Sequence, residues 1–295
     1  MKKVLFLTGT RADFGKLKSL ISVLSDKPDD YNVELVVTGM HLNPDFGNTH
    51  LEVERSFPNL TSHLFNNHDD TDTMDQILAK TVQGLSSILR KTSPDLFVIH
   101  GDRVEALAGA ISGAMNNVLV AHIEGGEISG TIDELIRHAT TKMSHIHLVA
   151  NENAKNNVIQ LGESKDSVFV IGSPDLDVMN SDTLPTLEEA KRYYEIDFDN
   201  YGIVLFHPVT TNLAEVAHGA DILEQVMRNS DRNFIVIMPN NDSGSSLIID
   251  KFNTLKDLPN VRVFKSLRFE YFLVLLREAG FIMGNSSAGV REAPH

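Results

Sequence analysis

Short apolar runs alternate with amphipathic stretches along almost the whole chain, and this rhythm limits the fold more than any other feature. Several runs are apolar at every position, which is typical of parallel strands that helices cover on both faces. The alternation predicts an α/β fold with doubly wound sheets. The expected strands are 4–8, 33–38, 96–100, 118–123, 146–150, 168–171, 203–206, 234–238, 261–264 and 281–284. The expected helices are 16–24, 74–91, 103–115, 133–144, 152–161, 214–228 and 269–278.

The strand rhythm is lost between residues 172 and 185, where turn residues replace the apolar runs. It restarts at Tyr201 with a strand that ends in a polar loop, as at the N-terminus. A chain of 295 residues is long enough for two domains with a core each. We therefore expect two Rossmann-like domains that face a cleft, one of residues 1–172 and one of residues 173–295. The second stops soon after a strand–loop–helix start, so we expect it to be incomplete.

The composition limits the cellular compartment and the binding partners that we expect for this chain. The chain has no cysteine, which excludes disulfides, thiolate catalysis and zinc fingers and favours a cytoplasmic protein. No apolar run reaches ~18 residues, so we expect no membrane-spanning helix. The first apolar run is too short for a signal peptide. Twenty-six basic against 40 acidic residues give a net charge of −14, which argues against a nucleic acid partner. The net charge does not exclude an anionic small molecule as the ligand.

The first candidate site follows the first strand. Residues 8–16 read TGTRADFGK, a glycine turn that leads into a helix and offers backbone N–H groups to an anion. Arg11 adds a bidentate phosphate donor. The segment is not a P-loop, because five residues separate its glycines and Leu17 replaces the Ser or Thr, and it is not a G-x-G-x-x-G loop. The alternative is a tight turn with a solvated arginine.

A second candidate site, HGDR at residues 100–103, ends another strand. Ligands bind at the carboxyl ends of strands in open α/β sheets, so Asp102 and Arg103 are candidates. The alternative is that Asp102 caps the following helix.

The third candidate site, HIEGGEISGTIDELIRH at residues 122–138, is the richest in charge. Glu124 follows a strand, and two glycines after it allow close backbone approach. Glu134 and His138 share one helix face. The spacing of Thr131 and Glu134 is also that of a capping box, which would make Glu134 structural. A metal site built from His122, Glu124 and His138 matches no zinc signature, and we expect no metal.

Polar loops also follow strands of the second domain. They read FHPVTT (206–211), PNNDSGS (239–245) and GNSSAGVRE (284–292). The last is rich in hydroxyl and amide groups and precedes a helix, which suits it to a diphosphate. The alternative is a plain serine N-cap.

Taken in order, these segments and TGMHLNPDFGNT (38–49) resemble the hydrolysing UDP-N-acetylglucosamine 2-epimerase family, which makes N-acetylmannosamine-type sugars for sialic acid and related sugars. The resemblance runs from Lys3 to Glu292. It implies the GT-B fold with two Rossmann-like domains, a homo-oligomer (dimer or tetramer), and no nicotinamide or metal. Chains of the family continue past the GNSS motif through an arginine-bearing loop and further helices.

The resemblance also implies the reaction and the site. A base removes the C2 proton as the nucleoside diphosphate leaves C1, and water adds to the resulting glycal with inversion at C2. The implied catalytic residues are Asp102, Glu124, Glu134 and His207. The implied substrate- or nucleotide-binding residues are Arg11, Lys16, His41, Arg103, Asp133, His138, Asn240, Ser286, Ser287 and Glu292.

Four alternatives stay open at this stage. The stretches AHIEGGEISGTIDELIRH and SLRFEYF also resemble the branch that acts on UDP- or GDP-linked N,N′-diacetylbacillosamine on the way to legionaminic acid. A GT-B glycosyltransferase would share the fold without needing three carboxylates. A nucleotide-sugar-binding remnant would bind without turnover, and a metal-dependent hydrolase would lose activity on chelation.

Overall fold

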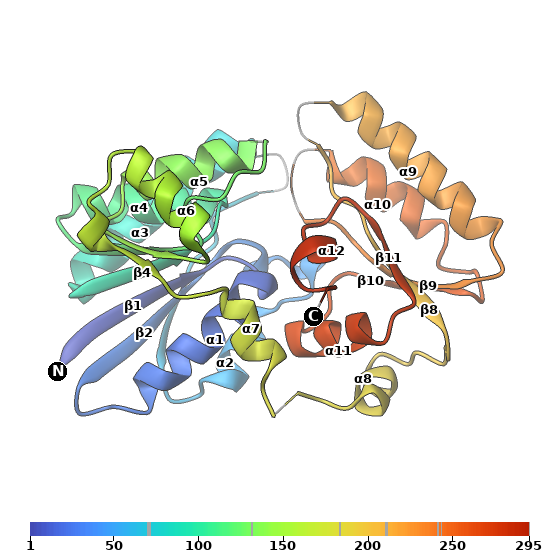
Figure 1. Cartoon of the computed structure of the whole chain (residues 1–295), viewed down its shortest axis with the longest axis horizontal. Helices are drawn as coiled ribbons and strands as arrows, with labels where there is room; N and C mark the ends of the chain where they lie inside the picture. Colours follow the sequence, from blue (N-terminus) through green and yellow to red (C-terminus); the bar gives the residue numbers. More distant parts are fainter. Residues whose placement is uncertain are drawn as a thin grey trace. The chain divides into compact units, whose positions relative to one another are not determined.

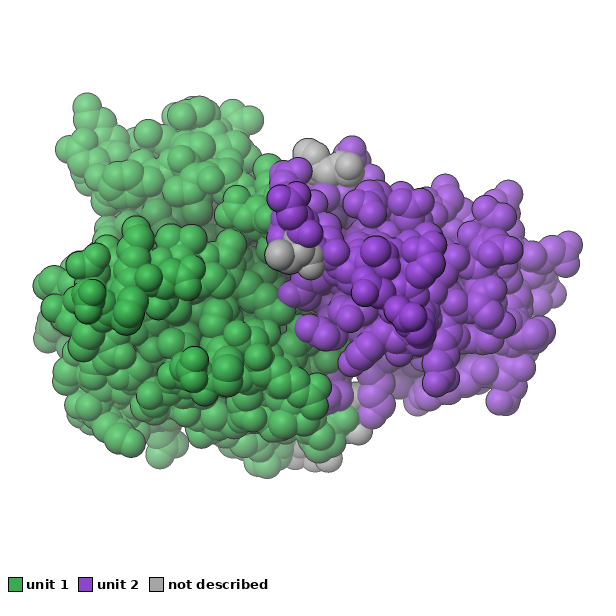
Figure 2. Space-filling view, turned by 90° about the horizontal axis from the view of Figure 1, so that it is seen from below, with its two compact units in different colours: residues 1–44, 48–178 green, residues 45–47, 179–295 purple. Residues whose placement is uncertain are grey.

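The chain forms two compact units in a computed structural model. Unit 1 comprises residues 1–44 and 48–178, and unit 2 comprises residues 45–47 and 179–295 (Figure 2). The main division falls after Val178, and residues 45–47 belong to unit 2. The structure describes residues 1–294 except Asp70, Thr71, Thr131, Thr183, Thr210, Thr211, Asn241, Ser243 and the side chain of Asp45.

Unit 1 is built on a parallel sheet whose strands, among the described residues, follow the order β3-β2-β1-β4-β5-β6-β7 (Figure 1). The strands are β1 (Lys2–Thr8), β2 (Tyr31–Val37), β3 (Thr61–Leu64), β4 (Leu96–His100), β5 (Leu119–Ile123), β6 (Ile146–Val149) and β7 (Val168–Val170). The helices are α1 (Arg11–Ser25), α2 (His50–Ser56), α3 (Met74–Thr92), α4 (Val104–Met115), α5 (Ile132–Lys142), α6 (Glu152–Gln160) and α7 (Pro174–Met179). Short 3₁₀ turns are Gly39–Leu42, Pro44–Phe46 and Lys165–Ser167.

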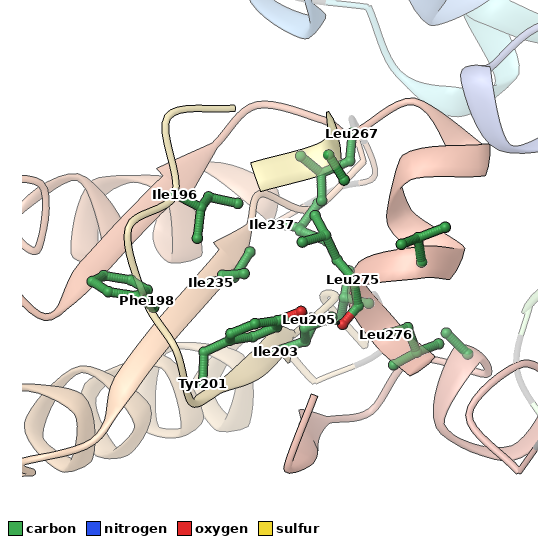
Figure 3. Packing of buried hydrophobic residues seen from close by; sticks show 13 residues of the cluster. Ile196, Phe198, Tyr201, Ile203, Leu205, Ile235, Ile237, Leu267, Leu275 and Leu276 are labelled. Atoms are coloured by element: carbon green, nitrogen blue, oxygen red, sulfur yellow. Dashed lines mark hydrogen bonds between the residues drawn. The ribbon is translucent and has the colours of Figure 1, made fainter. Parts of the chain in front are cut away.

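Unit 2 has a smaller parallel sheet in the order β10-β9-β8-β11. Its strands are β8 (Tyr201–Leu205), β9 (Asn233–Ile237), β10 (Val261–Phe264) and β11 (Phe281–Gly284). Its helices are α8 (Leu187–Tyr193), α9 (Leu213–Arg228), α10 (Ser245–Asn253), α11 (Phe269–Arg277) and α12 (Ala288–Arg291). One face of the sheet packs side chains of β8 and β9 against Leu275 and Leu276 of α11 (Figure 3).

Each sheet has a point where the strand order reverses. In unit 1, β1 pairs with β2 on one side and with β4 on the other. In unit 2, β8 pairs with β9 on one side and with β11 on the other. Open α/β sheets bind ligands outside the carboxyl ends of the strands at such reversals. Ligand-binding residues are therefore expected in the loops after β1 and β4 of unit 1 and in those after β8 and β11 of unit 2.

The α/β prediction is confirmed by this alternation of parallel strands and helices. Strand β3 was not expected, because its segment Thr61–Leu64 holds one apolar residue among polar ones and lies at the sheet edge. None of the described helices is long and apolar enough to cross a membrane.

Candidate functional site

Glu124 is the centre of a buried polar network in unit 1. It follows β5 directly, and its backbone has a left-handed φ of 63°. That conformation costs a residue with a side chain about 1–2 kcal/mol. Its Oε2 lies 3.4 Å from Nζ of Lys16 and 3.3 Å from Nε2 of His100, and its Oε1 accepts a hydrogen bond of 3.1 Å from Oγ of Ser173. A strained backbone beneath a buried, multiply held carboxylate points to a functional residue.

Asp175 extends this network. Its Oδ2 lies 3.2 Å from Nζ of Lys16 and accepts a hydrogen bond of 3.1 Å from Oγ of Ser173. The side chains of Lys16, Glu124 and Asp175 are only 12%, 6% and 4% exposed. The network joins α1 and the ends of β4 and β5 to the segment after β7. Sequence reasoning missed Ser173 and Asp175, because it treated residues 172–185 as a boundary segment.

Asp102 is held by a residue that the sequence did not single out. Its carboxylate accepts a hydrogen bond from the guanidinium of Arg137 on α5. The same arginine donates to the carbonyl oxygen of Glu127 at 2.9 Å and to Oγ of Ser129 at 3.2 Å. Arg137 is buried, and these hydrogen bonds connect the loop after β4 to the loop before α5.

Glu134 caps the start of α5. Its Oε2 accepts hydrogen bonds from the backbone N–H groups of Ser129 at 2.7 Å and Gly130 at 2.6 Å. These donors, that of Gly130 first, lower the pKa of Glu134. Thr131, the other half of the expected capping box, lies outside the described residues. His138 lies one turn on, with Nε2 3.9 Å from Oε1 of Glu134.

His122 is fully buried and bonded through both ring nitrogens. Its Nε2 lies 2.7 Å from the carbonyl oxygen of Gly101, and its Nδ1 lies 3.1 Å from Oγ1 of Thr141. A carbonyl oxygen can only accept, so Nε2 carries the proton and Nδ1 accepts from the threonine. Burial lowers the pKa of His122 to about 3. Among the described residues no group of three or more potential ligands is arranged to hold a metal ion.

His41 is buried in the same way. Its Nε2 lies 2.9 Å from Oγ1 of Thr8 and its Nδ1 lies 2.6 Å from Oγ1 of Thr49. Burial lowers its pKa to about 4. In this structure both ring nitrogens therefore bond within the protein, and the binding role of His41 stays a prediction.

We expect the protein to lose stability as the pH falls below about 6.5. Both histidines have a lower pKa in the folded chain than the ordinary 6.5, so the unfolded chain takes up their protons first. Their stabilising effect is full above pH 6.5 and is lost as the pH falls toward about 4 for His41 and about 3 for His122. Between pH 7 and 5 the pair should remove about 4 kcal/mol from the free energy of unfolding.

Urea unfolding at these two pH values measures the effect. A His122→Gln variant should lose about 2 kcal/mol less than the parent protein between pH 7 and 5, because residue 122 then takes up no proton on unfolding. A free energy of unfolding that stays flat from pH 7 to 5 in the parent protein would contradict the expectation.

Two predicted phosphate-binding arginines of unit 1 are each paired with a buried glutamate. Nε of Arg11 lies 2.9 Å from Oε2 of Glu52, and Nε of Arg103 lies 3.4 Å from Oε2 of Glu105. Oε1 of Glu105 also accepts a hydrogen bond of 3.3 Å from Nδ2 of Asn67. Each pairing restrains the guanidinium at its Nε edge.

The glycine turn after β1 differs from expectation. The backbone N–H groups of Gly9 and Thr10, which the sequence offers to an external anion, both donate to the carboxylate of Asp13 at 3.0 Å. Thr10 in turn accepts from the N–H of Asp13, which completes a capping box at the start of α1. The chain thus supplies its own anion to these two amides.

In unit 2 the loops after β8 and β11 are joined by Asn285. Its Oδ1 accepts from the backbone N–H of His207 at 2.8 Å, and its Nδ2 donates to the carbonyl oxygen of the same residue at 2.9 Å. His207 and the Ser286–Ser287 pair are therefore brought together at the strand reversal. Oγ of Ser286 accepts from the N–H of Ala288 at the start of α12. Asn285 was part of a predicted motif but was not predicted as a site residue.

The other two predicted residues of unit 2 are Asn240 and Glu292. The carbonyl oxygen of Asn240, after β9, accepts a hydrogen bond from Oγ of Ser245. Glu292 is buried at the end of α12. Asp133 lies in the first turn of α5 in unit 1. Within each unit the predicted residues gather at the carboxyl ends of strands, and their individual roles stay predictions.

Comparison with known proteins gives the family. The family model described as UDP-N-acetylglucosamine 2-epimerase matches residues 24–295. A UDP-N-acetylglucosamine 2-epimerase of Neisseria meningitidis serogroup B is 49% identical over 294 residues, covering 100% of this chain and 77% of the relative. A UDP-N,N′-diacetylbacillosamine 2-epimerase (hydrolyzing) of Legionella pneumophila is 31% identical over 296 residues, covering 99% of this chain and 78% of the relative.

The fold is shared with solved structures. The crystal structure of Methanocaldococcus jannaschii UDP-GlcNAc 2-epimerase in complex with UDP-GlcNAc and UDP matches with a TM-score of 0.78 at 21% identity, covering 99% of this chain and 81% of that one. This likeness confirms the GT-B-like fold predicted from the sequence. The match of the family model over nearly the whole chain, with the 49% identical relative, shows that the chain belongs to the UDP-N-acetylglucosamine 2-epimerase family.

Proposed function

We propose that the protein is a hydrolysing epimerase that converts UDP-N-acetylglucosamine and water to UDP and N-acetylmannosamine. A base removes the proton from C2, the C1–O bond to the diphosphate breaks, and a C1=C2 double bond forms. Water then adds its oxygen to C1, and a proton adds to C2 with inverted configuration. The observation that supports this chemistry best is the buried Glu124 network in a chain of this family.

The acid–base groups proposed are Asp102, Glu124 and Glu134. The C2 proton is weakly acidic, so its removal and return need positioned acid–base groups. Glu124 suits this role, because Lys16, His100 and Ser173 hold its carboxylate. Asp102 is oriented by Arg137. Glu134 is proposed with them by family likeness, and its capping bonds give it a structural role as well.

The leaving diphosphate needs positive charge and N–H donors. We assign this to Arg11 and Arg103 in unit 1, whose guanidinium groups are oriented by Glu52 and Glu105. In unit 2 we assign it to His207 and the Ser286–Ser287 loop that Asn285 ties to it. The further proposed binding residues are Lys16, His41, Asp133, His138, Asn240 and Glu292. We also propose that the protein works as a homo-oligomer in the cytoplasm.

The names of the relatives favour one substrate and make a second substrate possible. The 49% identical relative is named for UDP-N-acetylglucosamine, which makes this sugar nucleotide the first candidate. The 31% identical relative is named for UDP-N,N′-diacetylbacillosamine, which makes that nucleotide the second. Both would undergo the same elimination and hydration.

The proposal predicts that the C2 hydrogen of the product comes from solvent. The protein is incubated in D₂O with each of the two candidate sugar nucleotides, and the released sugar is examined by proton NMR and mass spectrometry. We expect free sugar of manno configuration with one deuterium at C2, and the faster substrate identifies the pathway. In ¹⁸O water the released UDP should stay unlabelled, because the C1–O bond breaks rather than a P–O bond.

Other outcomes separate the alternatives. Sugar that keeps protium at C2 would contradict the epimerase mechanism. Transfer to an acceptor sugar with C2 unchanged would indicate a glycosyltransferase. Binding of UDP without any released sugar would indicate a nucleotide-sugar-binding protein, and loss of activity with a chelator would indicate a metal-dependent hydrolase.

A further inference from the structure

Ser173 lies between two buried carboxylates. Its Oγ is 3.1 Å from Oε1 of Glu124 and 3.1 Å from Oδ2 of Asp175. A serine hydroxyl has one proton to donate. If both carboxyl groups are ionised, that proton serves two anions at once. Both contacts become full hydrogen bonds when one carboxyl group is protonated and donates to Oγ of Ser173.

The charges around Ser173 also leave room for one proton. Lys16 is 3.4 Å from Glu124 and 3.2 Å from Asp175, so one ammonium group faces two carboxylates. His100 of β4 faces Glu124 from the other direction. Asp175 is buried, and among the described residues its Oδ1 has no hydrogen-bond partner. Burying a polar oxygen without a hydrogen-bond partner costs free energy.

We propose that Ser173 and Asp175 are positioning residues that act through Glu124 by passing its proton to and from Asp175. The inference rests on the proposed function and deepens it. When Glu124 takes the C2 proton, the C2–H bond breaks and an O–H bond forms on Glu124. That O–H bond, at Oε1, then breaks as a new O–H bond forms on Ser173. The original hydroxyl proton of Ser173 moves to Oδ2 of Asp175. Glu124 is then a carboxylate again, Asp175 is neutral, and these two carboxyl groups beside Lys16 carry one negative charge instead of two. After the product leaves, the two transfers run in reverse and Glu124 gives the proton to water in the emptied site, so the next turnover starts with both groups ionised.

This transfer meets a requirement of the proposed reaction. The configuration at C2 inverts, so the proton that returns to C2 arrives on the face opposite the one it left. A base that has taken the first proton must therefore discharge it elsewhere before the next turnover. Glu124 is nearly enclosed, with a side chain 6% exposed, and Ser173 and Asp175 give its proton a path inside the protein.

Removing either residue should slow turnover without weakening substrate binding. We expect Ser173→Ala to lower kcat for UDP-N-acetylglucosamine about ten-fold, less than the ~10²–10⁴-fold of a lost acid–base group, with an unchanged KM. Ser173→Thr keeps the hydroxyl and should retain most of the activity. Asp175→Ala should lose a similar amount of kcat, and added formate should restore it in a concentration-dependent way, because formate supplies the missing carboxylate.

Three controls keep the test decisive. Asp175→Asn preserves the shape of the side chain and should lower kcat even if Asp175→Ala fails to fold. The parent protein should not be stimulated by formate. Neither should Asp95→Asn, whose carboxylate pairs with Lys2 at the opposite ends of the strands.

Full activity in Ser173→Ala or Asp175→Asn would overturn the inference. So would equal losses in Ser173→Ala and Ser173→Thr, or an Asp175→Ala protein that folds but does not respond to formate, since these indicate a purely structural role. Incorporation of deuterium at C2 by the parent protein in D₂O tests the proposed function separately from the proton path. If the parent incorporates deuterium and the variants behave as structural ones, only the proton path is wrong.

Discussion

Replacing Glu124 by glutamine should lower turnover of UDP-N-acetylglucosamine by ~10²–10⁴-fold and leave the affinity for UDP unchanged. Glutamine has the same shape, still accepts a hydrogen bond from Ser173 and tolerates the left-handed backbone no worse than glutamate. It cannot take a proton, so the loss falls on the chemical step. Steady-state release of UDP gives kcat, and calorimetric titration gives the affinity for UDP.

Glu134→Gln is the matched comparison. The amide oxygen of glutamine still accepts the N–H groups of Ser129 and Gly130, so α5 keeps its cap. The lowered pKa of Glu134 makes it a weak base at neutral pH. We therefore expect a smaller loss of turnover in this variant than in Glu124→Gln. The reverse order would move the base from Glu124 to Glu134.

Replacing Gly284 by alanine should unfold unit 2. A Cβ atom there would lie 1.7 Å from the carbonyl oxygen of Leu205, and the backbone φ is 137°, which side chains disfavour. Gly284 pairs with Leu205 in the parallel ladder of β11 and β8, so neither backbone moves without breaking the sheet. We expect a loss of about 4 kcal/mol or more, in the range reserved for severe backbone or packing conflicts.

Thermal melting followed by circular dichroism, with UDP binding as a second readout, measures this loss. Gly280→Ala is the control at the other end of β11, because the nearest atom to its Cβ is 3.7 Å away, an ordinary contact. A Gly284→Ala protein that melts like Gly280→Ala and still binds UDP would contradict the geometry at the β8–β11 pairing.

The sequence revealed the architecture because fully apolar runs and amphipathic stretches are signals that each element carries in itself. The same argument explains what was missed. Strand β3 is polar and lies at an edge, and α2 and α7 span only seven and six residues, too few for a helical period to stand out. The formation of such elements depends on contacts with segments that are distant in the sequence.

The candidate site also contains residues that the sequence could predict and residues that it could not. Residues directly after apolar strands, such as Asp102 and Glu124, were predictable because the carboxyl ends of parallel strands share one edge of the sheet. Ser173 and Asp175 were not, since about fifty positions separate them from Glu124 and the link depends on the side-by-side order of β5, β6 and β7. Asp13 was visible in the sequence, but its bonds to Gly9 and Thr10 depend on where its rotamer points.

The clamp that Asn285 makes on His207 has a consequence for the affinity of unit 2 for a nucleotide. Two loops that were separately mobile would each lose conformational entropy when a ligand ordered them, and that loss would weaken binding. Here two hydrogen bonds to one residue already fix the loops to each other before any ligand arrives. The entropy is lost during folding instead, so a diphosphate meets a preorganised surface and more of its contact energy appears as affinity.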